Sequence, residues 1–260
     1  YKFLGFIPCN IHLYGLVDEA GEVQLASNPN SARINIFGGD QYGTCIFSRI
    51  LYGARVSLTV PFVSAAISFI LGILLGGISG YFGGNIDLLM ERFTEILSGV
   101  PWIVVMTLAI LLLGNNIITF GMALCLTGWM GTAGTTRTQF YRYKGREYIL
   151  ASRTLGASDM RLIFKHILPN VISIILVNVT LDFAGCMLTE SSLSYLGFGV
   201  QYPRPTWGNM LNGANNATII NAYWWQWLFT AIFLAVTTIC INIVGDALRD
   251  VLDPKSNVDK

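Results

Sequence analysis

Charge is scarce in this sequence of 260 residues, because only 12% of the side chains are those of Asp, Glu, Lys or Arg. An average soluble domain has about 25% charged residues, roughly twice this share. Hydrophobic residues, by contrast, make up 53% of the chain. A chain so poor in charge and so rich in apolar side chains is expected to reside in a membrane.

The sequence also lacks the short motifs of common enzyme chemistry. It has no GxxxxGK[ST] phosphate loop, no GxSxG nucleophile turn and no HExxH zinc motif. His12 and His166 are the only histidines, and no Cys or His spacing matches a metal site. A membrane enzyme would need a polar catalytic cluster within its apolar segments, and the sequence shows none. No internal repeat favours the inverted-repeat design of many secondary transporters.

Five apolar stretches are each long enough to cross a bilayer, which takes about 20 residues of helix. Each stretch is nearly free of charge, and the exceptions are Asp182 and Asp246. We expect spans at 57–79, 96–113, 117–134, 171–188 and 227–248. The residues therefore predict an all-α integral membrane protein, with 57–248 as its transmembrane domain.

The orientation follows from the distribution of Lys and Arg. These residues are dense in 137–169 and recur in the tail 249–260, whereas the segment 189–226 contains only Arg204. The positive-inside rule then places 137–169 and the tail in the cytoplasm and 189–226 outside. Counting back, 1–56 lies outside as well. We therefore expect a further span before it, which gives six spans in the full protein.

Two patterns within the apolar stretches predict packing. Gly72, Gly76 and Gly80 recur every four residues, so they share one helix face and allow a second helix to approach closely. The run YWWQW at 223–227 is typical of aromatic residues at a membrane–water interface.

A charged, helix-forming segment interrupts the apolar chain at 147–170, EYILASRTLGASDMRLIFKHILPN. Residues 147–155 predict a short helix, and Gly156 fits the left-handed position that ends a helix. Ser158 or Asp159 can cap a second short helix, and Pro169 marks the start of the next span. The second helix is too apolar to stand free in water, so lipid headgroups, the protein's own spans or a partner protein must cover it.

This segment resembles the EAA coupling loop of ABC importer membrane subunits, whose pattern is EAA-x3-G-x9-I-x-L-P. Leu150-Ala151-Ser152 stand at the EAA positions, Gly156 at the glycine and Leu168-Pro169 at the end, while His166 replaces the usual isoleucine. The flanks GASD and HILPN resemble the dipeptide/oligopeptide branch of that family. FGGDQYGTCIFSRILYGARVSL, SGYFGGNIDLLMERFTEIL, TESSLSYLGFG, PTWGNML and GDALRDVLDPK resemble further segments of that branch. Gly-Thr-Cys at 43–45 departs from its Gly-Arg-Asp, and the segment 1–36 is longer than usual.

The resemblance implies the type I permease fold of ABC importers, in a bacterial or archaeal plasma membrane. It implies a non-catalytic subunit that forms half of a pathway for oligopeptides or dipeptides. The expected partners are a second homologous permease, two cytoplasmic ATPases that hold ATP and Mg²⁺, an extracytoplasmic peptide-binding protein and the lipid bilayer. This chain itself is expected to bind no cofactor, metal or nucleic acid. The open alternatives are a permease for nickel or another small solute, a peptide exporter subunit and a non-transporting scaffold.

Coupling to the ATPase is assigned by the same resemblance to the segment 147–169. Met160, Leu162 and Phe164 are expected to fill a hydrophobic groove on the ATPase, framed by charged side chains. The residues expected to take part are Glu147, Ala151, Ser152, Arg153, Gly156, Ala157, Ser158, Asp159, Arg161, Phe164 and Pro169.

Three polar residues are candidates for the pathway. Asn178 and Asp182 lie four residues apart on one helix face, and an acid inside a span usually faces a polar cavity or a partner. Substrate contact and a structural hydrogen bond to the neighbouring subunit both remain open. Glu190 could meet the amino terminus of a peptide or brace the loop beside it. Cys9 and Cys45 share the predicted outer face and could form a disulfide.

Overall fold

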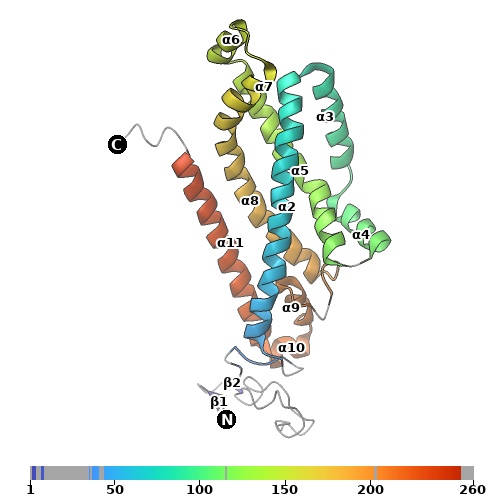
Figure 1. Ribbon diagram of the computed structural model, residues 1–260. Helices are drawn as coiled ribbons and strands as arrows, with labels where there is room; N and C mark the ends of the chain where they lie inside the picture. Colours follow the sequence, from blue (N-terminus) through green and yellow to red (C-terminus); the bar gives the residue numbers. More distant parts are fainter. Residues whose placement is uncertain are drawn as a thin grey trace. The chain divides into compact units, whose positions relative to one another are not determined.

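The computed structural model describes residues 2–3, 7–8, 35, 37–40, 44–114, 116–201 and 204–252, and helices make up most of them (Figure 1). Two short strands, β1 (Lys2–Phe3) and β2 (Ile7–Pro8), pair antiparallel. The helical elements are α2 (Ile46–Phe82), α3 (Gly84–Ser98), α4 (Trp102–Leu113), α5 (Ile117–Lys144), α6 (Glu147–Thr154), α7 (Asp159–Arg161), η1 (Leu162–Ile167), α8 (Leu168–Tyr195), α9 (Trp207–Gly213), α10 (Ala217–Ala222) and α11 (Trp224–Leu252).

Within the described residues, four helices are long and apolar enough to cross a membrane. They run over Ile46–Phe82, Ile117–Lys144, Asp159–Tyr195 and Trp224–Leu252. Each contains one of the predicted spans, so the prediction of an all-α membrane protein is confirmed.

The remaining predicted span, 96–113, corresponds to a bent pair of helices and not to one continuous helix. Its first residues belong to α3, and the chain bends by 75° between α3 and α4. Pro101 stands at the N-cap of α4 with an extended conformation, φ −54° and ψ 125°. A proline removes a backbone donor and disfavours the helical conformation of the residue before it, here Val100. Neither α3 nor α4 alone is long and apolar enough to cross a membrane, but the two helices together are.

The chain divides into two compact units. The first contains the start of α2, the end of α8, α9, α10 and the start of α11. Two buried tryptophans hold it together: the indole of Trp207 donates to the carbonyl of Ile50 at 3.0 Å, and that of Trp225 donates to the carbonyl of Gly39 at 3.0 Å. Trp225 is therefore a core residue, and the interfacial position of the run 223–227 stays a prediction.

Helix α9 lies within the segment 189–226 that is predicted to face outward. Thr206 and Asn209 form a reciprocal capping box at its start. A Cβ atom built on Gly208 would lie 2.5 Å from the Cβ of Ser194, so only glycine permits this close approach of α9 to the end of α8. Since Trp207 and Met210 are buried as well, α9 is a packed part of the first unit.

The second unit contains the rest of α2, α3 to α7, η1, most of α8 and the end of α11. Its central contact is a seam between α2 and α5. A Cβ atom built on Gly72 would lie 2.6 Å from the Cβ of Thr132, and one built on Gly80 would lie 2.5 Å from the carbonyl oxygen of Arg137. Gly76 meets the backbone of Ala133 in the same way. The predicted role of the three glycines in close helix packing is confirmed.

Candidate functional site

The segment 147–169 forms the predicted helix break at Gly156. Helix α6 ends in a pair of hydrogen bonds in which Gly156 N–H donates to the Arg153 carbonyl at 3.0 Å and Ala157 N–H donates to the Ser152 carbonyl at 3.2 Å. Gly156 has φ +86°, which favours glycine over any other residue. These bonds are those of a Schellman motif, and they satisfy carbonyl groups that the helix end would otherwise leave without partners.

The second helix of the segment begins as predicted but does not stop at Pro169. Ser158 stands at the N-cap of α7 with extended backbone, φ −68° and ψ 152°, although its side chain makes no capping hydrogen bond. From Asp159 the helix continues without interruption to Tyr195. The six residues of η1 form a π-helical turn, in which Leu168 N–H donates to the Ile163 carbonyl. This wider turn comes directly before Pro169, which has no N–H, and thereby accommodates the proline inside a continuous helix.

The inner face of the segment packs on the second unit. Ile149, Leu162 and Ile167 are buried in one cluster with Tyr81 of α2 and Phe140 of α5. The expectation that Leu162 fills a groove on another protein is therefore wrong, since its side chain is wholly buried within this chain. The second helix has apolar side chains on both its buried and its exposed face, and the sequence pattern alone did not show which side chain lies on which face.

The outer face of the segment presents apolar side chains that nothing in the described part of the chain covers. Leu155 is 89% exposed, Met160 66% and Phe164 57%. We call these three residues the outer patch. The charged residues predicted to frame it, Glu147, Arg153, Asp159 and Arg161, are all exposed as well. Of the other predicted coupling residues, Ala151, Gly156, Ser158 and Pro169 are exposed, whereas Ser152 and Ala157 are half-buried.

Tyr81 attaches the segment to the end of α2, and the sequence gave no reason to single it out. Its hydroxyl donates to the Asp159 carboxylate at 2.5 Å, and Arg153 contacts the same carboxylate at 3.4 Å. Lys144 of α5 donates to the backbone carbonyl of Tyr81. In the second unit, α6 and α7 accordingly lie at the end where α2 gives way to α3 (Figure 1). Burial raises the pKa of Tyr148, on α6, above its ordinary value.

We expect Tyr81→Phe to loosen the segment without changing its apolar packing. The variant removes one hydrogen bond to a charged group, which is worth about 1.5–3 kcal/mol. Hydrogen–deuterium exchange should therefore be faster in α6 and α7 and unchanged in α9. Tyr141→Phe is the matched control, because Tyr141 is 72% exposed on α5. Equal exchange in α6 and α7 of both variants would show that the Asp159 contact does not hold the segment.

The pathway candidates differ in their surroundings. Asn178 is half-buried and donates to the Ile174 carbonyl of its own helix at 3.1 Å, and Asp182 is exposed one turn further on. Glu190 is 0% exposed, and it accepts from the Ser194 hydroxyl at 2.8 Å and from the Ser191 hydroxyl at 3.4 Å. These contacts favour the bracing role that the sequence left open for Glu190 over contact with a substrate.

The remaining site predictions concern cysteines and metals. Cys45 is half-buried, but Cys9 lies outside the described residues, so their disulfide stays a prediction. In the part of the chain that the structure describes, no group of three His, Cys, Asp or Glu side chains is arranged to hold a metal ion.

Comparison with known sequences identifies one family. The family described as "Binding-protein-dependent transport system inner membrane component" matches residues 72–258. The dipeptide transport system permease protein DppC of Bacillus subtilis is 43% identical over 84% of this chain and 68% of its own length. The oligopeptide transport system permease protein OppC of the same organism is 41% identical over 84% of this chain and 71% of its own. OppC of Haemophilus influenzae is 38% identical over 89% and 74%.

Solved structures show the same fold. An inward-facing structure of the MetNI methionine ABC transporter superposes with a TM-score of 0.61 at 17% identity, over 80% of this chain and 98% of that chain. An amino acid ABC transporter superposes with a TM-score of 0.58 at 16% identity, over 78% and 94%. At these identities the likeness concerns the fold alone, which is that of an ABC importer permease.

Proposed function

Because the chain belongs to the family of binding-protein-dependent transport system inner membrane components, we propose that it forms half of the translocation pathway of an ATP-driven importer for dipeptides or oligopeptides. The observation that carries the substrate class is the identity of 38–43% with dipeptide and oligopeptide permeases over most of the chain. It is a multi-pass protein of the plasma membrane, and its transport system includes an ATPase and a solute-binding protein.

The proposed assembly pairs this chain with a second homologous permease and two ATPase subunits that hold ATP and Mg²⁺. In this arrangement 137–169 and 249–260 face the cytoplasm, while 1–56 and 189–226 face outward, as the distribution of Lys and Arg indicates. The extracytoplasmic binding protein delivers the peptide to the outward side.

The outer patch is the proposed contact with the ATPase. Leu155, Met160 and Phe164 form an exposed apolar surface framed by charges, which is the kind of surface that a groove on a partner covers. The opposite face of the same segment is fixed by Ile149, Leu162 and Tyr81. A movement of the ATPase is therefore transmitted to α2 and α8, because the segment cannot slide over them.

Asp182 is the proposed pathway residue that pairs with the peptide's amino terminus. It is an exposed acid in the middle of a membrane-spanning helix, where a charge is costly without a polar partner. Asn178 lies one turn away on the same face and lends further polarity to it. If the chain were instead a permease for nickel or another small solute, Asp182 would not select peptides by their free amino terminus.

We expect Asp182→Asn to reduce uptake of unblocked peptides by about ten- to a hundredfold, because a hydrogen bond to a charged group is worth about 1.5–3 kcal/mol. The measurement is uptake of a labelled peptide into proteoliposomes that contain the full complex, ATP and the binding protein. Thr180→Val is the matched control, since the Thr180 hydroxyl donates to the Leu176 carbonyl of its own helix.

The same assay tests the proposed function as a whole. Uptake of peptide that depends on both ATP and the binding protein supports a peptide importer. Uptake of a metal ion or another small solute in place of peptides would show that the complex transports a different substrate. Peptide movement that needs no binding protein would favour an exporter.

A further inference from the structure

Helix α3 is held in the second unit without burying any of its side chains. It begins at Gly84, directly after the N-cap Gly83; the φ angles of Gly83 and Gly84 are +68° and +58°, and a Cβ atom at either position would meet nothing within 4 Å. It ends at Gly99, directly before the 75° bend that leads into α4. Both ends of this 15-residue helix thus lie next to glycine, which allows backbone rotation at low cost.

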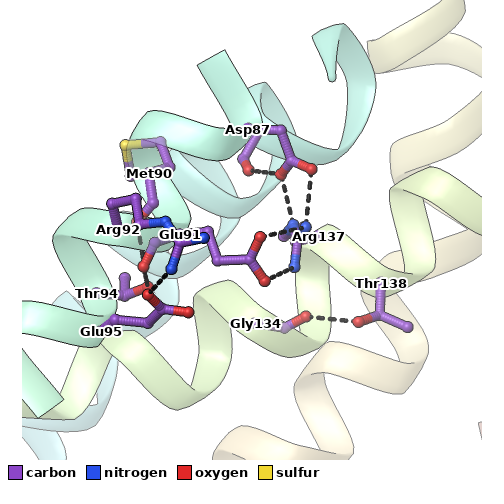
Figure 2. A network of polar contacts seen from close by, with 10 residues as sticks. Asp87, Met90, Glu91, Arg92, Thr94, Glu95, Gly134, Arg137 and Thr138 are labelled. Atoms are coloured by element: carbon purple, nitrogen blue, oxygen red, sulfur yellow. Dashed lines mark hydrogen bonds and ion pairs between the residues drawn. The ribbon is translucent and has the colours of Figure 1, made fainter. Parts of the chain in front are cut away.

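Besides a stacked contact between Phe93 of α3 and Trp129 of α5, whose ring centroids lie 6.4 Å apart, a network of charged side chains holds α3 in place (Figure 2). The guanidinium of Arg137, on α5, forms a two-pronged pair with Asp87 of α3, in which Nη2 donates to Oδ2 at 2.8 Å and Nε donates to Oδ1. Glu91, one turn further along α3, accepts from Nη1 at 3.3 Å and from Nη2 at 3.4 Å. The hydroxyl of Ser79, on α2, also donates to Asp87. One arginine therefore joins two successive turns of α3 to α5.

Arg137 is fixed on its own side of this network. The Gly80 contact described above presses α2 against the backbone of Arg137, so the pair of α2 and α5 is a rigid support. The Arg137 side chain is 35% exposed and that of Asp87 21%, so the fork is partly shielded from water. A partly buried two-pronged pair is stronger and more exact in geometry than an exposed ion pair.

Beyond the network, α3 does not close on the packed pair of α2 and α5. A cavity of about 260 Å³ lies between them, lined among others by Gly76, Ser79, Glu91, Thr94, Glu95 and Arg137. Helix α3 is therefore attached by its charged face and has open space beside that attachment. A helix held in this way can change its tilt when the charged contact is broken, because α3 buries no side chain and, beside the charged network, only the Phe93–Trp129 stacking has to rearrange.

We infer that Arg137 is a positioning residue of the transport cycle, whose contacts with Asp87 and Glu91 lock α3 to α5 in one of the two states of the pathway. When the lock opens, α3 pivots about the glycines at its two ends. This inference rests on the proposed function, because transport supplies the two states, but the lock itself can be measured without transport.

The experiment measures the separation of α3 and α5 by pulsed electron spin resonance in the full complex. Spin labels are placed at Leu89 and Thr138, which are exposed on these helices, after replacement of the five native cysteines. We expect one narrow distance in the nucleotide-free wild type and a second distance with a bound ATP analogue. Arg137→Gln should broaden the nucleotide-free distribution, and Asp87→Arg/Arg137→Asp, which restores an opposite pair, should narrow it again.

Two further variants are needed to interpret the result. Arg137→Lys retains the charge and should fold even where Arg137→Gln does not, and loss of the two-pronged geometry should still broaden the distribution. Arg92→Gln is the control, because Arg92 is 66% exposed and pairs with Glu95 of its own helix. We also expect the amount of peptide imported per ATP hydrolysed to fall at least threefold in Arg137→Gln and to recover in the double variant.

Several results would overturn the inference. An unchanged distance in both Arg137→Gln and Arg137→Lys would show that Arg137 does not position α3. A wild-type distance that is the same with and without nucleotide would show that α3 does not move in the cycle. Altered distances together with a normal amount of peptide imported per ATP would show that the lock has no role in transport. If the wild type imports no peptide at all, the proposed function fails, and the distances alone still decide whether the lock exists.

Discussion

Replacement of Gly156 by tryptophan is expected to abolish both transport and association with the ATPase, while the protein still inserts into the membrane. Gly156 has φ +86°, and a Cβ atom there would meet nothing within 4 Å. The backbone strain of an L-residue in this conformation is only about 1–2 kcal/mol, so the variant should fold. The indole would instead project from the turn between α6 and α7, next to the outer patch, and keep a partner's surface away from it.

The strain and the bulk can be separated by a second variant. Asparagine adopts the left-handed conformation more readily than other residues with a side chain, and it adds little volume. Gly156→Asn should therefore retain most of the ATPase association. The measurement is the amount of ATPase that copurifies with equal amounts of each variant. Normal copurification and uptake with Gly156→Trp would remove the coupling role from this segment.

Replacement of Gly76 by valine is expected to prevent the second unit from forming. A Cβ atom at Gly76 would overlap the carbonyl group of Ala133, and the backbone of α5 cannot rotate away as a side chain could. Overpacking of a close contact costs about 1–3 kcal/mol, and here α2 would have to move away along its whole seam with α5. We expect a cost of about 3 kcal/mol or more, which lowers the ratio of folded to unfolded protein by roughly a hundredfold.

Gly131→Val is the matched control for this prediction. Gly131 lies on the exposed side of α5, and a Cβ atom there meets nothing within 4 Å. Size-exclusion chromatography in mild detergent should show a folded peak for Gly131→Val and aggregated or absent protein for Gly76→Val. Equal recovery of the two variants would contradict the view that the glycine seam sets the distance between α2 and α5.

Local patterns predicted the parts of the fold that depend on backbone chemistry. The spacing of Gly72, Gly76 and Gly80 was sufficient to predict a helix seam, because only glycine allows backbones to approach so closely. The turn at Gly156 was predictable for the same reason, since few residues adopt φ +86°. Long apolar runs predicted four continuous helices, and the presence of Pro101 could have predicted the break in the remaining stretch.

Tertiary contacts decided what local patterns could not. Leu162 and Phe164 are both apolar residues of one short segment, yet the first is buried against Phe140 and the second is exposed. Glu190 could meet a substrate or brace a loop, and its contacts with Ser191 and Ser194 together with its complete burial favour the bracing role. The pairing of Arg137 with Asp87 joins residues 50 positions apart. Only the spacing of Asp87 and Glu91, one helical turn, hinted that both acids face one partner.

Copurification of the full-length protein from its native membrane in mild detergent, with mass spectrometry of the bound chains, tests the central proposal most directly. We predict recovery of a second permease and of one or more ATPases that contain the phosphate loop that this chain lacks. Loss of those ATPases in Gly156→Trp, with the second permease retained, would assign the contact to the segment 147–169. Recovery of no ATPase from the wild type, under conditions that keep other ABC importers intact, would contradict the proposal that this segment couples transport to ATP.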